Sequence, residues 1–433
     1  MERMKSAYIF IIILFIICLP LHRIEAEESL AWVDCLSEAK KNNPELISAV
    51  ETINTQKAAK AVSASALFPQ IDSSLGASTA GTSTTSSSTA VTTKSTTDTY
   101  TYGVSGTQLI FDGLKTYSNI KADKENIKAA EQAYRFTSSE VRLNLRTAFI
   151  NLLKAQELVR VAEEIVKIRR DNLVLITLEY QSGLEHRGAL LTAEANLAAA
   201  NFGLSQARRN VEFSKRQLSK EMGRKEFKPF SVAGDFSIRD SAKEKPDFED
   251  LVKTNPSLLQ AAFKKNSASY GVKSAYGNFA PELSGTAGAS KRSSQWPPED
   301  NQWNLGLSLS MPVFEGGLRT AQVSQAQATY RKAQADERTA RDTAIVGLEQ
   351  AWAALQDAIE TVIVQQKTLQ ASEERSKISE AQYSIGFIAF DNWIIIENDL
   401  VAAKKSYLQA QANALLAEAN WIQAKGETLE YAQ

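Results

Sequence analysis

Cysteine and histidine are scarce in this chain of 433 residues, which contains two of each, and one of each lies within the first 26 residues. The remainder therefore holds a single cysteine, Cys35, and a single histidine, His186. One thiol cannot form an internal disulfide, and two such side chains are too few for a metal cluster or for a nucleophile with its base. We therefore predict no catalytic residue, metal site or cofactor, and we do not expect an enzyme. Cys35 is expected to pack on a helix, and His186 to lie in a solvated turn.

The chain also has no excess of charge of either sign, because it contains 49 Lys and Arg residues and 50 Asp and Glu residues. Removing residues 1–26 leaves this balance close to neutral. A protein that binds nucleic acid usually carries a strongly basic face, so nucleic acid is not predicted as a partner.

The first 26 residues have the pattern of a signal peptide, which would be residues 1–26. Arg3 and Lys5 precede an apolar run that ends at Leu19, and Ala26 supplies a small residue at a suitable cleavage point. A spanning helix needs about 20 apolar residues, so this run is short for one, although a retained membrane anchor is the alternative. The rest of the chain is expected to leave the cytoplasm.

Proline is absent from residues 70 to 228 and from 313 to 433, so two very long stretches lack the strongest helix breaker. In the first, apolar side chains recur at alternating spacings of four and three residues from Val141 to Tyr180, interrupted only at Arg169. This is the heptad pattern of a coiled-coil seam. A helix over 120–181 would span about 90 Å at 1.5 Å per residue, which is too long for a compact core.

Shorter helical segments are expected on both sides of this long helix, at 44–67 and 188–222. Stacked end to end, the two would cover the seam along its length. A second set has the same pattern, with segments 256–279 and 391–426 and a seam that includes Leu348 and Leu355. Its later positions are polar, so its lower end is expected to face water; these positions are Gln365, Ser372, Ser376 and Ser379. A free coiled-coil rod is the alternative.

The two sets arise because the chain is a tandem repeat. "IFDGLKTYSN" at 110–119 returns as "VFEGGLRTAQ" at 313–322, and "NPELISA" at 43–49 returns as "NPSLLQA" at 255–261. The predicted division is a first repeat at 27–223, a linker at 224–247 with room for a short strand, and a second repeat at 248–433.

Each repeat also contains segments with the two-residue period of a β-strand. The alternation is clear at 303–311 and 100–106 and weaker at 70–78 and 282–290. Strands of roughly ten residues that are apolar on one side and small or polar on the other are typical of outer-membrane barrels. A half-buried soluble hairpin is the alternative. The predicted aromatic girdle at the membrane surface consists of Tyr100, Tyr102, Trp296 and Trp303.

A tract rich in Ser and Thr, residues 79–99, lies between the first two strands and is expected to be a surface loop. Four strands cannot close a barrel, because known membrane barrels begin at about eight. Open strand edges cannot stand in hydrocarbon, so the chain must share its barrel with other copies of itself.

In its tandem repeat and its motifs the chain resembles the TolC-like outer-membrane efflux proteins. The motifs are "EAKKNNPEL" at 38–46, the strand exits "FDG" and "FEGG", and the turns "YQSG" and "YSIG". The resemblance implies a mainly α protein whose long antiparallel hairpins form a coiled-coil α-barrel, with four strands per chain in a trimeric 12-stranded transmembrane β-barrel. It also implies an exit duct for efflux or type I secretion, in the outer membrane and the periplasm.

The implied partners are two further copies of the chain, outer-membrane lipid, a periplasmic adaptor (membrane fusion) protein and an inner-membrane pump of the resistance-nodulation-division, ABC or a similar class. The alternative is a structural, non-conducting periplasmic coiled-coil protein fixed to the outer membrane. Neither the cargo nor the particular pump is specified by any motif, and no role is assigned to Cys35.

By the same resemblance, the helical turns at 180–188 and 383–391 form the periplasmic tip that meets the adaptor, with docking residues Gly183, Leu184, Gly386 and Phe387. The family's acidic ring falls on Asn392 and Ile395, so this chain departs from the pattern. The position that should offer an acid to Tyr383 is Ala189, so that contact is expected to be missing. Asp391 and Asp399 are expected to supply the charge of the aperture; ordinary solvated helix residues are the alternative.

Overall fold

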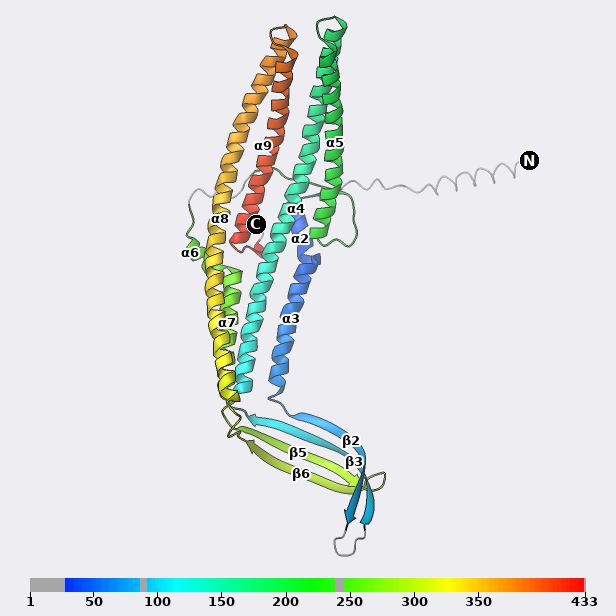
Figure 1. Ribbon diagram of the computed structural model, residues 1–433, viewed down its shortest axis with the longest axis vertical. Coiled ribbons are helices and arrows are strands. Elements are labelled where there is room, and N and C mark those ends of the chain that lie inside the picture. Colours follow the sequence, from blue (N-terminus) through cyan, green and yellow to red (C-terminus); the bar gives the residue numbers. More distant parts are fainter. Residues whose placement is uncertain (1–27, 86–91, 238–244, 432–433) are drawn as a thin grey trace, which may run out of the picture.

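The computed structural model describes residues 28–85, 92–237 and 245–431, so the predicted signal peptide lies outside the described residues. A long bundle of helices stands on one end of a curved sheet (Figure 1). In chain order the elements are β1 Glu28–Leu30, α2 Trp32–Asn42, α3 Pro44–Ser65, β2 Gln70–Thr85, β3 Thr92–Phe111, α4 Lys115–Gln181, α5 Arg187–Glu221, β4 Phe230–Val232, α6 Phe248–Leu251, η1 Val252–Thr254, α7 Pro256–Gly277, β5 Glu282–Ser293, β6 Asp300–Ser310, α8 Leu318–Ser384, α9 Phe390–Ala424 and η2 Leu429–Tyr431.

The two longest helices, α4 and α8, have 67 residues each and are therefore about 100 Å long. The first begins five residues before the predicted start at 120, because the strand exit itself caps it. Asp112 Oδ2 accepts hydrogen bonds from the backbone nitrogen of Thr116 at 2.8 Å and from its hydroxyl at 2.6 Å. Leu114 stands before the helix with a φ of 63°, and Gly317 holds the equivalent place before α8 with a φ of 86°.

The shorter helices stack end to end in pairs, as predicted, and each pair runs beside a long helix (Figure 1). At the junction of α3 and α5, the Asn43 side chain caps α3 and also donates to the carbonyl oxygen of Glu221 at 3.0 Å. Asn255 does the same between α7 and α9, where it donates to the carbonyl oxygen of Ala424 at 3.4 Å. Each junction therefore satisfies backbone groups that a helix end would otherwise leave unpaired.

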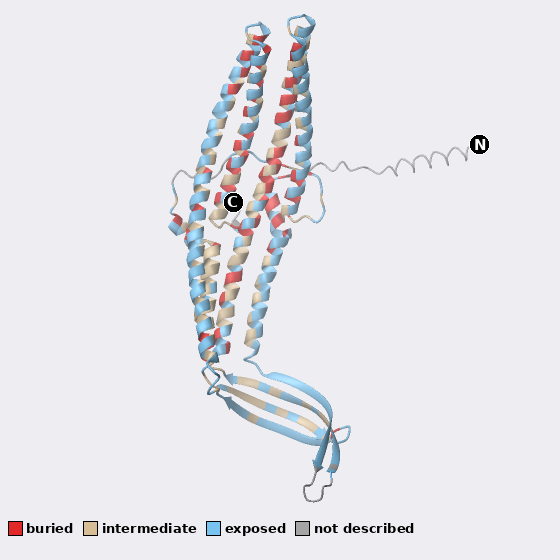
Figure 2. Ribbon diagram, viewed as in Figure 1, coloured by how far each residue is buried: buried red, intermediate tan, exposed pale blue. Residues whose placement is uncertain are grey.

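The core follows α4, which packs against α3 and α5 on one side and against α7 and α9 on the other. Buried residues accordingly concentrate along this helix (Figure 2). At mid-height a larger cluster forms, in which Leu145 and Leu152 of α4 meet Cys35 of α2 and Phe230 of β4. The short strand allowed for in the linker is β4, and it pairs in parallel with β1.

The expectation that the seam of α8 faces water at its lower end is wrong. Ser372, Ser376 and Ser379 are all buried. Serine is small enough to let α9 approach closely, and its hydroxyl can be satisfied locally: Ser376 donates to the carboxylate of buried Glu397, and Ser379 donates to the carbonyl oxygen of Ser376 at 2.9 Å. A polar residue in a seam therefore did not indicate exposure here.

The four long strands form one antiparallel sheet in the order β2-β3-β5-β6. The Ser/Thr-rich tract at 79–99 is not a loop over most of its length, which corrects the prediction. Strand pairing continues from Thr79 with Asp98 as far as Thr85 with Thr92. Threonine is β-branched and favours extended backbone, and Thr79 adds a 2.7 Å hydrogen bond from its hydroxyl to Asp98. The hairpin therefore projects well beyond the sheet (Figure 1).

Candidate functional site

The sheet has one apolar face and one polar face, because residues paired across antiparallel strands point to the same side. One row across all four strands consists of Ile71, Gly106, Ala287 and Leu305. The next row along the strands points to the other side and consists of Asp72, Ser105, Gly288 and Asn304. The apolar face is exposed in the single chain: 81% of Trp303 and 79% of Leu305 are accessible. Such a continuous apolar surface indicates contact with lipid or protein.

Crowding between glycines and their neighbours differs between the two faces. A methyl group added at Gly103 or Gly288 of the polar face would lie 2.6 Å from Ser290 Cβ or 2.5 Å from Asn304 Oδ1, respectively. On the apolar face, a methyl group at Gly106 or Gly285 would approach no atom closer than 3.5 Å. In the two central strands the polar face is therefore the more crowded one, as expected for the inside of a curved sheet. This is the arrangement of a barrel wall with a wet interior.

The four predicted girdle residues lie at one end of this sheet or beside it. Tyr100, Tyr102 and Trp303 share the apolar face, as their pairing with Ser293, Lys291 and Ala289 of β5 requires. Trp296 belongs to the β5–β6 loop, and its ring meets that of Tyr100 edge-on, with the ring centres 6.2 Å apart. Their role at a lipid surface stays a prediction.

The far ends of the helical hairpins are tight turns of the same type in both repeats. Gly183 and Gly386 both have a φ of 73°, a conformation that glycine adopts without strain. In each turn the residue after the glycine donates back to the end of the long helix, Leu184 to the carbonyl of Glu179 at 2.9 Å and Phe387 to that of Gln382 at 2.8 Å. Leu184 and Phe387 are both exposed, so each turn presents an apolar side chain at its end.

Tyr383 joins the two hairpins just behind these turns. Its ring stacks on Trp393 of α9, with the ring centres 4.5 Å apart and the planes 7° from parallel, and Phe390 meets both rings edge-on. Its hydroxyl donates to Glu185 Oε1 at 2.9 Å, and Glu179 Oε2 lies 3.5 Å away. Burial, together with these two carboxylates, raises the pKa of the phenol.

Ala189 offers no acid to Tyr383, as expected, yet two other acids lie within reach of its hydroxyl. The acids come instead from the end of α4 and from the α4–α5 turn. Matching equivalent positions of the two repeats could not find these acids, because Glu179 and Glu185 precede Ala189 in the chain and do not occupy its position.

The other aperture candidates lie on α9, and their role stays a prediction. Asp391, Asn392 and Ile395 are exposed in the single chain. Asp391 lies in the first turn of α9, where a negative charge is favoured by the helix dipole. Asp399 is half exposed and pairs with Arg375 of α8, with 3.8 Å between Nη1 and Oδ2. Within the single chain, Tyr383 is therefore packed among other side chains, whereas Asp391, Asn392, Ile395 and Asp399 lie on the surface.

Cys35 is a packed core residue, and His186 caps a helix. Cys35 is fully buried in the mid-height cluster, where burial raises the pKa of its thiol to about 12. His186 caps α5, since its Nδ1 accepts from the backbone nitrogen of Ala189 at 3.1 Å. In the described part of the chain, no group of three or more metal-binding side chains occurs.

None of the described helices has a stretch long and apolar enough to cross a membrane. Residues 35–224 and 248–428 match the family of outer membrane efflux proteins. The chain belongs to this family. The outer membrane efflux family consists of channel proteins rather than enzymes, and its members form the exit duct of efflux and type I secretion systems in the outer membrane and periplasm. That is the function and location of this chain.

Relatives with curated names match this efflux protein over about two thirds of their length or more. The efflux protein BepC of Brucella suis is 22% identical over 399 residues, covering 90% of this chain and 84% of BepC. TolC of Escherichia coli is 22% identical, covering 74% of this chain and 68% of TolC. The alkaline protease secretion protein AprF of Pseudomonas aeruginosa is 23% identical, covering 71% of this chain and 66% of AprF.

Solved structures share the fold of this efflux protein. CusC superposes with a TM-score of 0.80 at 17% identity, covering 90% of this chain and 91% of CusC. The outer-membrane channel OprN gives 0.80 at 16%, covering 92% of this chain and 90% of OprN. CmeC of Campylobacter jejuni gives 0.76 at 20%, covering 90% and 84%.

Proposed function

We propose that three copies of the chain close into one continuous duct, with a 12-stranded barrel in the outer membrane and a helical tunnel below it. The observation that carries this proposal is the two-faced, curved sheet, whose apolar face suits lipid and whose more crowded polar face suits a water-filled lumen. Four strands in each chain give twelve in a trimer, which members of the family form.

The free edges of the sheet support closure through other copies. In the order β2-β3-β5-β6, the outer edges are β2 and β6. Unpaired backbone groups are costly in hydrocarbon, so β6 of one copy would pair with β2 of the next. Trp303, Leu305, Leu307 and Leu309 on β6 would then continue an apolar band around the barrel.

The helical packing also indicates where a neighbouring copy would bind. The long helix α4 packs against both stacked pairs, whereas its repeat partner α8 packs against α7 and α9. By analogy with α4, the second stacked pair beside α8 would be α3 and α5 of the neighbouring copy. Exposed apolar side chains on both helical edges fit such a contact; these are Val346, Ile363 and Val364 of α8, Val62 of α3, and Phe202 and Phe213 of α5.

Partners fit the two ends of this tube. Family members work with an adaptor and an inner-membrane pump in three-part systems. The turns with Gly183, Leu184, Gly386 and Phe387 would meet the periplasmic adaptor, because they hold exposed apolar side chains on rigid glycine turns. The residues Tyr383, Asp391, Asn392, Ile395 and Asp399 would line the aperture behind them. The girdle residues Tyr100, Tyr102, Trp296 and Trp303 would lie at the lipid surface.

The assembly is tested by extracting the protein from the outer membrane in mild detergent and measuring its mass and its conductance in planar bilayers. A trimer that conducts ions is expected. A monodisperse monomer would contradict the shared barrel. A trimer that does not conduct would favour the alternative of a structural, non-conducting periplasmic protein.

A further inference from the structure

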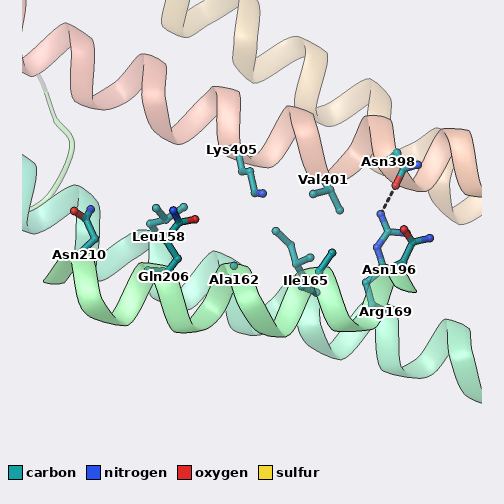
Figure 3. Close-up of a pocket in the computed structure, with 14 residues that line it drawn as sticks. Leu158, Ala162, Ile165, Arg169, Asn196, Gln206, Asn210, Asn398, Val401 and Lys405 are labelled. Carbon is teal, nitrogen blue, oxygen red and sulfur yellow. Dashed lines mark hydrogen bonds between the residues drawn. The ribbon is translucent and has the colours of Figure 1, made fainter. Parts of the chain in front are cut away.

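A cavity of about 510 Å³ lies between α4, α5 and α9, between mid-height and the tip turns, and its lining residues are drawn in Figure 3. Its floor is apolar and comes from α4, with Leu158, Ala162 and Ile165, while Val401 of α9 adds one wall. On the opposite wall, α5 contributes mainly small residues, including Gly203, where an added methyl group would meet no atom within 4 Å. The cavity is thus open because the side chains of α5 are short. Its volume lies within the range of pockets that hold small molecules.

One end of this cavity carries buried hydrogen-bond donors that the described residues leave without acceptors. Arg169 is only 5% exposed; its Nη2 donates to Asn398 Oδ1 at 2.6 Å, while its Nη1 is buried without a partner. The side-chain nitrogen of Asn196 is likewise buried without a partner and lies beside Arg169 (Figure 3). Buried donors are almost always paired, so two at one place indicate an acceptor that occupies the cavity.

The charge at this site is positive. Burial lowers the pKa of Arg169 against the opposing effect of Glu397, but a guanidinium stays charged in proteins. Glu397 is itself engaged by the hydroxyl of Ser376. Lys405 of α9 also lines the cavity and points toward it in Figure 3. Arg169 and the buried donors at one end of the cavity, with Lys405 farther along it beyond Val401 (Figure 3), favour a ligand with an acidic group and an apolar body.

The segment that follows β4 packs on the same helices as the cavity. Phe236, which follows β4, packs against the buried cluster of Val161, Ile165 and Leu408 beside the cavity. Phe236 also packs against Ile150, Ala412 and Leu415, so this segment lies on the side of the cavity nearer mid-height. A molecule bound in the cavity would bridge α4 and α5 of one hairpin to α9 of the other.

We propose that this cavity is a binding site for small organic anions, with Arg169 and Asn196 holding the acidic group and the α4 floor holding the apolar body. The site goes beyond the proposed duct, because a solute held between the hairpins is neither cargo in a lumen nor an adaptor at the tip. Its occupation would hold the two hairpins together.

The experiment uses the purified full-length protein in lipid nanodiscs, without pump or adaptor, and 2-naphthoate as the probe. Calorimetric titration should show binding of 2-naphthoate and at least tenfold weaker binding of 2-naphthamide, which has the same shape but no charge. Equal binding of the amide, or no binding of either compound, would overturn the proposal. Displacement of the naphthoate by equimolar inorganic sulfate would also overturn it, since the apolar body would then contribute nothing.

Two variants locate the site. Arg169→Gln should weaken naphthoate binding at least tenfold, while Arg170→Gln, at the exposed neighbouring position, should leave it unchanged. Gly203→Leu should abolish binding by filling the cavity, and it does not threaten folding because leucine is a better helix former than glycine. Full binding by the Gly203→Leu variant would place the ligand elsewhere and overturn the assignment. Because neither variant alters the sheet, trimer mass and conductance report separately on the proposed duct.

Discussion

The hydroxyl of Tyr383 lies 2.9 Å from Oε1 of Glu185, and this hydrogen bond joins the end of α8 to the turn between α4 and α5. The equivalent residue of the first repeat, Tyr180, is 39% exposed and forms no such contact in the described chain. The two repeats, similar in fold, are therefore different at the tip. Tyr383 holds the hairpins together, whereas Tyr180 does not.

Tyr383→Phe should loosen the tip, because it removes this hydrogen bond and keeps the ring stacked on Trp393. We expect a loss of about 1.5 to 3 kcal/mol in the free energy of unfolding, the usual net value of a hydrogen bond to a charged group. Conductance in planar bilayers should rise, since the hairpins would separate more often. Tyr180→Phe is the matched control and should change neither quantity. Equal effects from both substitutions would show that the Glu185 contact is unimportant.

The buried seam predicts large effects from truncation. Leu152 and Leu355, at equivalent positions of the two repeats, are fully buried. Replacing either by alanine should destabilise the chain by about 2 to 5 kcal/mol, the usual cost of a large-to-small change in a core. The measurement is denaturant unfolding followed by circular dichroism. Val174→Ala on α4 is the control, because 58% of that side chain is exposed, and it should cost far less.

The acids of α9 are predicted to set ion preference. In a trimer each acid becomes a ring of three, and such a ring favours cations. Asp391→Asn with Asp399→Asn should therefore reduce cation preference in planar-bilayer recordings. Asp391→Asn alone should account for most of this reduction in cation preference, because the charge of Asp399 is already offset by Arg375. Asp171→Asn on exposed α4 surface serves as the control. Unaltered selectivity in the double variant would place both acids outside the lumen.

Gly386 is predicted to be needed for docking of the adaptor. Its φ of 73° is closed to proline, whose ring fixes φ near −65°, so Gly386→Pro must distort the turn. Binding to the cognate adaptor, measured by surface plasmon resonance, should weaken, while size-exclusion chromatography should still show trimers. Gly386→Ala should have a smaller effect in the same direction. Undiminished binding by the proline variant would remove this turn from the docking surface.

Cys35 should be chemically inert in the folded protein. It is fully buried, and the thiolate that would react is suppressed because burial raises its pKa from 9.0 to about 12. A chromogenic disulfide reagent at pH 8 should therefore find no thiol until the chain is unfolded. The folded state holds this proton more tightly, so the contribution of Cys35 to stability is present below pH 9 and is lost as the pH rises toward 12. Rapid labelling of the folded protein would contradict the burial.

The sequence by itself determined the long helices, the central parts of the four long strands, and their order along the chain. Heptad spacing and the absence of proline give the long helices, because these patterns are local consequences of helix geometry. Two-residue alternation likewise gives the strands and the apolar face that carries Trp303 and Leu305. The repeat gives the stacked pairs, since each copy supplies the same set of segments.

Only the tertiary structure decided which polar residues are buried and what they contact. Ser376 and Arg169 both interrupt an apolar seam, yet the first is satisfied by Glu397, and the second keeps a donor without a partner beside a cavity. Tyr383 finds its acid in Glu185, nearly two hundred positions earlier in the chain. Whether a polar atom is satisfied depends on groups brought close by packing, and packing joins residues whose separation in sequence carries no periodic signal.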